Sequence, residues 1–364
     1  MRPLLVELNR DYRGGQHQAL LLLQGLVARG HAAELVTLRD SILASRARSA
    51  GITVHGLNAR ARRLAAAIVI RRLVRERRAD VVHANEPHAL TAAWLARAHH
   101  HVPLVVSRRV IFPLSLNSIA LARYRAAARI LAVSQCVKNA VLVSGLPLDR
   151  ITVIPVGVNI PPPPSLLERV TARRKLAVGQ EGIFLGNVGA FTPDKGQALL
   201  IRAFAHVREQ FPQCQLLLAG DGPERIKLRA LVKHLQLDPA VQFTGFVGDV
   251  ETIYEGIDLF VFPGLADALP TVLLAAMAHG LPVVGLARGG VPEVLEDGKN
   301  GLLVGEPDPK SLAEAISRLL SSPAEARRLG EAARETIIAG FSADHMVEQT
   351  LRVYEESIAA RARS

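Results

Sequence analysis

Short apolar runs alternate with longer segments of helical pattern along most of the chain. The first half contains such runs at PLLVEL (3–8), AAELVTL (32–38), ADVVHA (79–84), VPLVVS (102–107), ARILAVS (128–134) and ITVIPVG (151–157). Short runs that are apolar on both faces and rich in β-branched residues are typical of buried parallel strands. Segments of helical length, such as GQHQALLLLQGLVARG, separate them, so the pattern predicts a doubly wound α/β domain.

The second half repeats this alternation after a break at IPPPPSLL (160–167), whose four consecutive prolines cannot continue a helix or a central strand. Apolar runs resume at IFLGNVG (183–189), CQLLLAG (214–220), VQFTGF (241–246), DLFVFP (258–263), PVVGL (282–286) and GLLVG (301–305). We therefore expect one domain at 1–160, a second α/β domain at 161–340, and a helix at 341–364 that packs back toward the first. The expected ligand site is the cleft between the domains, at the carboxyl ends of the strands.

Composition indicates a globular protein with an aliphatic core. Of its 364 residues 49% are hydrophobic and 21% charged, whereas aromatic residues make up only 4%. No apolar run reaches the roughly 18 residues that a membrane-spanning helix needs, and no secretory signal opens the chain. Cys136 and Cys214 stand far apart, without paired spacing. We therefore expect two free thiols and a cytoplasmic protein.

Positive charge is concentrated in the first half. Residues 1–160 hold 23 lysines and arginines against 8 acidic residues, and residues 161–364 hold 21 against 25. An asymmetry of this kind indicates an anionic partner for the first half. A membrane surface, a nucleic acid and an acidic substrate each fit this description.

Two loop-to-helix junctions have the residues of an anion-binding site. Gly14 and Gly15 stand before a predicted helix, where backbone N–H groups can approach a ligand closely. Lys195 and Gly196 open a second helix after a strand, so the ammonium group could meet a phosphate that the helix N-terminus attracts. A flexible turn at the glycines and a solvated lysine are the alternative interpretations.

A third junction, in FVFPGLADALP, combines a carboxylate with a helix N-terminus. Pro270 fits the first position of the helix. The N–H groups of Ala268, Leu269 and Thr271 could then bind further phosphate oxygens. Asp267 only accepts hydrogen bonds when it is ionised, which suits the hydroxyl groups of a sugar. A helix cap or an ordinary loop acid is the alternative interpretation for Asp267.

The sequence lacks the usual motifs for phosphate-binding loops, metals and dinucleotide cofactors. The sequence has no G-x-x-x-x-G-K-[ST] loop, no D-x-D pair for a metal that bridges phosphates, and no zinc spacing. The G-x-G of AGDGPERIKLRAL follows a strand but lacks the third glycine of a dinucleotide-binding loop. We therefore expect neither a metal nor a bound cofactor.

Several longer segments match, in order, those of a known family. They are VGAFTPDKG, LLLAGDGPER, VQFTGFVGDV and DLFVFPGLADALPTVLLAAMAHGLPVVGLARGGVPEVLEDGKNGLLV, with RGGQ, DVVHANEPHA and ILAVSQCVKNAVLVSGLPLDRITVIPVGVN in the first half. Together they resemble the family-4 retaining glycosyltransferases of the GT-B fold, over nearly the whole chain. The resemblance implies two doubly wound Rossmann-like domains facing each other across a cleft. It also implies a nucleotide-diphosphate sugar as donor and co-substrate, and a transfer that needs no metal.

Four positions depart from the family's pattern at the donor site. The family has two glutamates eight positions apart around the helix N-terminus, one for the donor sugar and one for the ribose; here they are Asp267 and Ala275. The family's arginine ahead of the lysine is Ala190, which leaves Lys195 as the main contact to the diphosphate. Arg108 aligns with a histidine that the family often places near the reacting carbon of the sugar. Each lost charged hydrogen bond would weaken donor binding by about 1.5–3 kcal/mol unless another group replaces it.

Three interpretations of function follow. The first is an active glycosyltransferase with an altered donor site, with Asp267 and Arg108 at the reacting sugar, whose acceptor is a glycan or a lipid-linked acceptor of cell-envelope polysaccharide or lipopolysaccharide. The second is a GT-B protein that has lost catalysis and serves as a binding partner or scaffold. The third, a nucleic-acid-binding module, is disfavoured because the basic runs lack interleaved aromatic residues. We therefore expect no nucleic-acid partner.

The most basic segment, residues 59–80, suggests a contact with an anionic surface. It carries eight arginines around the apolar stretch from Leu64 to Ile70. On a helix, Leu64 and Ile68 share one face and arginines flank it. An ordinary domain helix with a solvated basic side is one interpretation. The other is a peripheral contact with anionic lipid on the inner face of the membrane.

Overall fold

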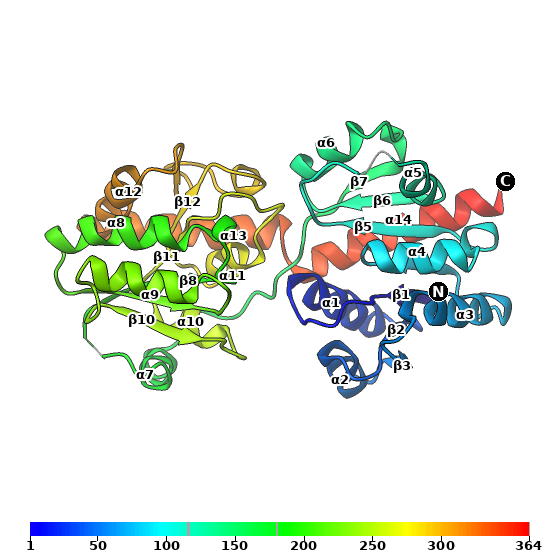
Figure 1. Cartoon of the computed structure of the whole chain (residues 1–364), viewed down its shortest axis with the longest axis horizontal. Helices are drawn as coiled ribbons and strands as arrows, with labels where there is room; N and C mark the ends of the chain where they lie inside the picture. The colour runs from blue at the N-terminus through cyan, green and yellow to red at the C-terminus, as the bar shows by residue number, and fades with distance from the viewer. Residues whose placement is uncertain (115–116, 180, 364) are drawn as a thin grey trace. The chain divides into compact units, whose positions relative to one another are not determined.

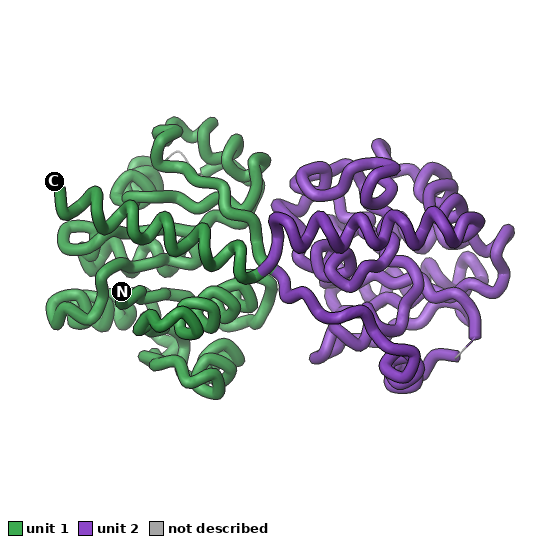
Figure 2. The backbone as a smooth tube through the Cα atoms, turned by 180° about the vertical axis from the view of Figure 1, so that it is seen from behind, with its two compact units in different colours: residues 1–157, 343–364 green, residues 158–342 purple. Residues whose placement is uncertain are grey.

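The computed structural model describes residues 1–114, 117–179 and 181–363. The chain forms two compact units (Figure 2). Unit 1 consists of Met1–Gly157 and Ala343–Ser364, and unit 2 of Val158–Ser342. The last helix of the chain thus belongs to the same unit as the first strand.

Unit 1 is built on a seven-stranded parallel sheet in the order β3-β2-β1-β4-β5-β6-β7. Its strands are β1 (Pro3–Val6), β2 (Glu34–Leu38), β3 (Thr53–Leu57), β4 (Val81–Ala84), β5 (Leu104–Arg108), β6 (Arg129–Ala132) and β7 (Ile151–Val153). Its helices are α1 (Gly14–Ala28), α2 (Ile42–Ser49), α3 (Arg62–Arg75), α4 (Pro87–Leu95), α5 (Ser118–Arg125), α6 (Gln135–Leu142) and α14 (Ala343–Ala362). Helix α1 packs against α2 and α14, whereas α4 packs against α3 and α5. The two groups cover opposite faces of the sheet (Figure 1).

Helix α14 completes the core of unit 1. Met346, Val347 and Tyr354 are buried against α1 and the sheet. The helices approach closely at Gly25, where a Cβ atom would lie 2.5 Å from Cγ2 of Val347. The Tyr354 hydroxyl lies 2.6 Å from Nδ1 of His83 in β4. The last helix is therefore tied to the centre of the sheet by both apolar packing and a buried hydrogen bond.

Unit 2 is built on a six-stranded parallel sheet in the order β10-β9-β8-β11-β12-β13. Its strands are β8 (Ile183–Val188), β9 (Cys214–Ala219), β10 (Val241–Gly245), β11 (Leu259–Phe262), β12 (Val283–Leu286) and β13 (Leu302–Val304). Its helices are α7 (Leu166–Lys175), α8 (Gln197–Gln210), α9 (Arg225–His234), α10 (Glu251–Gly256), α11 (Thr271–Ala278), α12 (Pro309–Ser321) and α13 (Pro323–Gly340). Helix α8 packs against α9 and α12, whereas α11 packs against α13 and α10 against α7.

The predicted fold class is confirmed, because every apolar run quoted above contains a strand of one of two parallel sheets. The pattern missed β3, an edge strand whose sequence TVHGL is partly exposed and contains a glycine. Two helix starts also differ from the prediction. Gly14 and Gly15 are the first two residues of α1, and Pro270 is the N-cap of α11 rather than its first residue. Within the described residues, no helix has the length and apolarity to cross a membrane.

Candidate functional site

In unit 2, Lys195 and Asp267 meet at the carboxyl ends of two neighbouring strands. Lys195 ends a short 3-10 turn (Pro193–Lys195) after β8, and Asp267 lies in the loop between β11 and α11. Because β8 and β11 pair in the sheet, both loops emerge at the same edge. The Lys195 Nζ lies 2.5 Å from Oδ1 of Asp267, and the two side chains are 25% and 18% exposed. Two residues that the sequence singled out separately therefore form one partly buried ion pair.

Close backbone contacts fix the loop that carries Asp267. On one side, the Leu265 N–H donates to the Asp194 carbonyl at 2.8 Å. Gly196 adopts φ +70°, and a Cβ atom there would lie 2.0 Å from the Pro263 carbonyl oxygen. On the other side, the Gly290 N–H donates to the Asp267 carbonyl at 2.9 Å. The Asp267 loop is thus held between the loops that carry Asp194 and Gly290. Gly196 permits a close approach to the Pro263 carbonyl that no residue with a side chain would allow.

The start of α11 offers hydrogen-bond donors next to this pair. Among the described residues, no side chain caps the helix, so the N–H groups of Thr271 and Val272 remain available to an anion, whereas the Leu273 N–H donates to the Pro270 carbonyl. Ala268 and Thr271 are half-buried and Leu269 is buried. The Asp267 Oδ2 is buried and has no hydrogen-bond partner among the described residues. The site therefore combines a cation and N–H donors, which suit phosphate, with a carboxylate oxygen that can accept a hydroxyl.

Two positions of the predicted donor site, 190 and 275, are alanines and offer no polar side chain to a ligand. Ala190 is exposed just beyond the end of β8. Ala275 lies one turn after Thr271 on the half-buried side of α11, outside the packed core. A longer side chain at position 275 would therefore point along the same face of the helix as Thr271.

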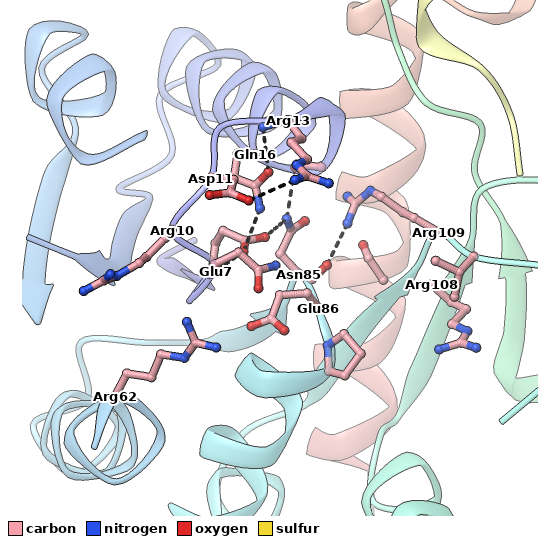
Figure 3. A pocket seen from close by; sticks show the side chains of 15 residues that line it. Glu7, Arg10, Asp11, Arg13, Gln16, Arg62, Asn85, Glu86, Arg108 and Arg109 are labelled. Atoms are coloured by element: carbon pink, nitrogen blue, oxygen red, sulfur yellow. Dashed lines mark hydrogen bonds and ion pairs between the residues drawn. The ribbon is translucent and has the colours of Figure 1, made fainter. Parts of the chain in front are cut away.

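In unit 1, Gly15 and Arg108 line a pocket of about 570 Å³ (Figure 3). Gly14 opens α1 beside it. Arg108 ends β5 and is 8% exposed. Its Nη2 donates to the Phe112 carbonyl at 2.5 Å, and its guanidinium group points away from Asn85 (Figure 3). Arg108 is therefore engaged by its own loop.

Most other residues that line this pocket were not predicted as site residues, among them Glu7, Asn85 and Glu86, and Arg109 lines it as well. Glu7 is buried, and its carboxylate accepts hydrogen bonds from Gln16 Nε2 at 3.1 Å and from Asn85 Nδ2 at 2.5 Å. Arg109 Nη1 donates to the Asn85 carbonyl at 2.7 Å. Their position in the sequence could have identified them, because polar residues that directly follow apolar runs lie at the carboxyl edge of a parallel sheet.

Burial shifts the protonation equilibria in this pocket. Burial and the nearby Glu7 raise the pKa of Glu86 to about 7. Glu86 also caps α4, accepting from the His88 and Ala89 N–H groups at 2.5 and 2.7 Å. Burial lowers the pKa of Arg109 to about 10, so this arginine stays charged at neutral pH.

Comparisons with known proteins give the family. Residues 168–336 match the family described as glycosyl transferases group 1, and residues 12–160 match glycosyltransferase family 4. An alpha-maltose-1-phosphate synthase of Mycolicibacterium smegmatis is 31% identical over 311 residues, which cover 76% of this chain and 79% of that protein. The chain belongs to the group 1 glycosyltransferases. The family predicted from the sequence motifs is thereby confirmed.

Further similar proteins support the same family and fold. The lipopolysaccharide core biosynthesis glycosyltransferase LpsE of Rhizobium meliloti is 31% identical over 50% of this chain and 52% of that protein. The chain spans about half the length of several curated relatives that it matches. The crystal structure of Anabaena Alr3699/HepE in complex with UDP superposes with a TM-score of 0.82 at 23% identity, over 98% of this chain and all of that one. This likeness shows the GT-B fold.

Proposed function

We propose that this protein transfers a sugar from a nucleotide-diphosphate donor to a hydroxyl group of a glycan or lipid-linked acceptor, with retention of anomeric configuration. The observation that carries the proposal is the Lys195–Asp267 pair beside the uncapped start of α11. The Anabaena structures with UDP and with UDP-glucose support a nucleotide sugar as donor. The LpsE relative supports an acceptor in lipopolysaccharide or other cell-envelope polysaccharide synthesis.

In this proposal, the donor's diphosphate binds Lys195 and the first N–H groups of α11. A phosphate oxygen gains from both, since the ammonium group supplies a full charge and the helix N-terminus oriented dipoles. The donor sugar binds Asp267, whose Oδ2 accepts one of its hydroxyl groups. The pairing of Lys195 with Asp267 sets the diphosphate next to the sugar that it carries.

The proposed reaction is a same-face displacement. The bond between the sugar's anomeric carbon and the phosphate oxygen breaks, and the acceptor oxygen bonds to that carbon on the same face. The acceptor proton moves to an oxygen of the leaving phosphate. Lys195 and the N–H groups of α11 stabilise the charge that develops on that phosphate, so the scheme needs neither a protein nucleophile nor a divalent metal.

A donor screen tests this function. Common nucleotide sugars are incubated with the protein, hydrolysis and transfer products are detected, and calorimetry measures binding of the free nucleotide diphosphates. We expect one donor to be consumed, and Lys195→Ala to weaken nucleotide-diphosphate binding by more than about tenfold, because a charge-assisted contact is lost. The exposed Lys299 supplies a matched control, since it pairs with Glu296 and Lys299→Ala should bind as wild type does. Wild-type protein that binds no nucleotide diphosphate would favour the scaffold interpretation.

We further propose that unit 1 rests on an anionic membrane surface through α3. Ala66, Ala67, Ile70, Leu73 and Val74 bury one side of this helix. Leu64 and Ile68 on its other side are 60% and 71% exposed. Exposed arginines follow on the next turns of the same side, at positions 71, 72 and 75. Exposed arginines beside exposed apolar side chains suit contact with an anionic headgroup layer, because the positive charges attract it.

A further inference from the structure

The pocket of unit 1 lies where the order of its sheet reverses. The chain runs from β1 outward to β2 and β3, then returns to β4 on the other side of β1. In open parallel sheets, ligands bind at such a switch point, beyond the carboxyl ends of the strands. The pocket is lined by residues that follow β1, β4 and β5 and by the first turns of α1 and α3 (Figure 3). Its volume of about 570 Å³ suits a small polar ligand.

The floor of the pocket offers buried oxygen atoms that accept hydrogen bonds from hydroxyl groups. Glu7 and Glu86 are 1% and 8% exposed there, and neither forms an ion pair within the described part of the chain. Asn85 is 3% exposed, and its Oδ1 has no hydrogen-bond partner among the described residues. A buried acceptor without a partner is costly unless a ligand or water supplies a donor. The floor therefore favours a neutral ligand group with hydroxyl donors.

The rim of the same pocket carries two unpartnered cations. Arg10 follows β1 and Arg62 begins α3, and both line the pocket. Neither forms an ion pair or a hydrogen bond with any other residue that the structure describes. The other arginines of the pocket are engaged: Arg13 pairs with Asp11, and Arg109 donates to Asn85. Arg10 and Arg62 are therefore the groups available to a ligand.

We propose that this pocket binds the acceptor and that it selects acceptors carrying an oxyanion, either a phosphate or a carboxylate, which Arg10 and Arg62 contact. The acceptor's hydroxyl groups face the floor, where Asn85 Oδ1 accepts one of them. The positions of these groups set the orientation, because Arg10 and Arg62 hold the anionic group at the rim while the buried oxygen acceptors of the floor favour hydroxyl groups. The inference rests on the proposed glycosyltransferase activity and specifies its acceptor class.

Calorimetry with the full-length protein tests the acceptor class. The probes are glucose 6-phosphate, glucuronate and glucose, with UDP titrated separately. We expect one of the two anionic sugars to bind at least about tenfold more tightly than glucose, because a bidentate arginine contact is worth about a factor of ten or more. The octyl glycoside of the preferred sugar distinguishes a soluble acceptor from a lipid-linked one.

Paired variants on one helix make the test specific. Arg62→Gln should remove the preference for the anionic sugar and leave UDP binding unchanged, and Arg62→Lys should keep part of the preference. The matched control is Arg63→Gln, because Arg63 is the exposed neighbour in α3 and does not line the pocket. Equal binding of charged and neutral sugars would overturn the inference while leaving the donor function intact. An Arg62→Gln variant that loses UDP affinity would instead assign this arginine to the donor.

Discussion

At the scale of single residues, the ion pair between Lys195 and Asp267 changes how each one is understood. The sequence indicated a phosphate contact and a sugar contact at two separate junctions. In the structure, Nζ and Oδ1 lie 2.5 Å apart, so the two groups share one electrostatic environment. Removing the charge of one residue therefore changes the electrostatic environment of the other, and a substitution at either position affects both.

Asp267→Asn should separate sugar recognition from nucleotide binding. The amide keeps the size of the side chain but loses its charge, which frees Lys195 for phosphate. We expect transfer, measured as kcat/KM, to fall by about a hundredfold or more, while UDP affinity from calorimetry stays within about threefold. Asp194→Asn is the control, since Asp194 is the other acid near Lys195, at 3.6 Å. Equal losses in transfer and UDP affinity would place Asp267 in a structural role.

Ala275→Glu should restore a carboxylate that the family uses to hold the ribose. The position one turn after Thr271 is half-buried and not part of the packed core, so we expect unchanged thermal stability. Nucleotide-diphosphate affinity should rise by about tenfold, because hydrogen bonds from the ribose hydroxyl groups to a charged acceptor are gained. Ala275→Gln, which has the same size without the charge, should gain less. A destabilised variant, or one with unchanged affinity, would contradict this assignment.

At the scale of the elements, the sequence predicted the sheets well because their strands are buried on both faces. Short continuous apolar runs such as CQLLLAG, bounded by turn residues, are typical of strands that are buried on both faces. The edge strand β3 lacked this signal, since its residues are partly exposed. The residues of the unit 1 pocket were missed for a related reason. Glu7 and Asn85, which directly follow β1 and β4, contact each other although they are 78 positions apart in the chain, and no local pattern reports such a pairing.

The contact between α14 and β4 belongs to this scale and can be measured. His83 is 1% exposed, and burial lowers its pKa to about 3, so its ring is neutral at pH 7. Its two nitrogens lie 2.6 Å from the Tyr354 hydroxyl and 2.8 Å from Ser107 Oγ. Tyr354→Phe would leave one buried nitrogen unpaired, so we expect a loss of about 1–3 kcal/mol in the free energy of unfolding.

Urea denaturation checks this expectation. Tyr12→Phe is the comparison, because the Tyr12 hydroxyl also contacts a histidine, at 3.3 Å, but in a partly buried position. Its loss should be clearly smaller. Equal midpoints for wild type and Tyr354→Phe would show that apolar packing alone holds α14 in place.

At the scale of the whole molecule, charge divides with the two units. Unit 1 holds 26 lysines and arginines against 12 acidic residues, and unit 2 holds 18 against 21. The sequence predicted this asymmetry, since charge depends on composition alone. It did not separate the two uses that we propose for the basic residues of one segment. Arg62 lines the pocket, whereas Arg71, Arg72 and Arg75 are exposed further along the same helix.

The exposed arginines of α3 lead to a prediction about binding to lipid vesicles. At roughly 1 kcal/mol per basic residue near an anionic surface, the arginines of α3 suffice for reversible association. We expect the protein to sediment with vesicles that contain phosphatidylglycerol at low salt, and less so at 0.5 M salt, where the Debye length is only a few ångströms (about 4 Å). Leu64→Ser combined with Ile68→Ser should weaken binding further, because in this proposal both exposed side chains insert between headgroups. The control is Ile226→Ser in unit 2, where an isoleucine that is 82% exposed also stands between basic residues. No sedimentation at low salt, or the same loss in both variants, would contradict a membrane contact through α3.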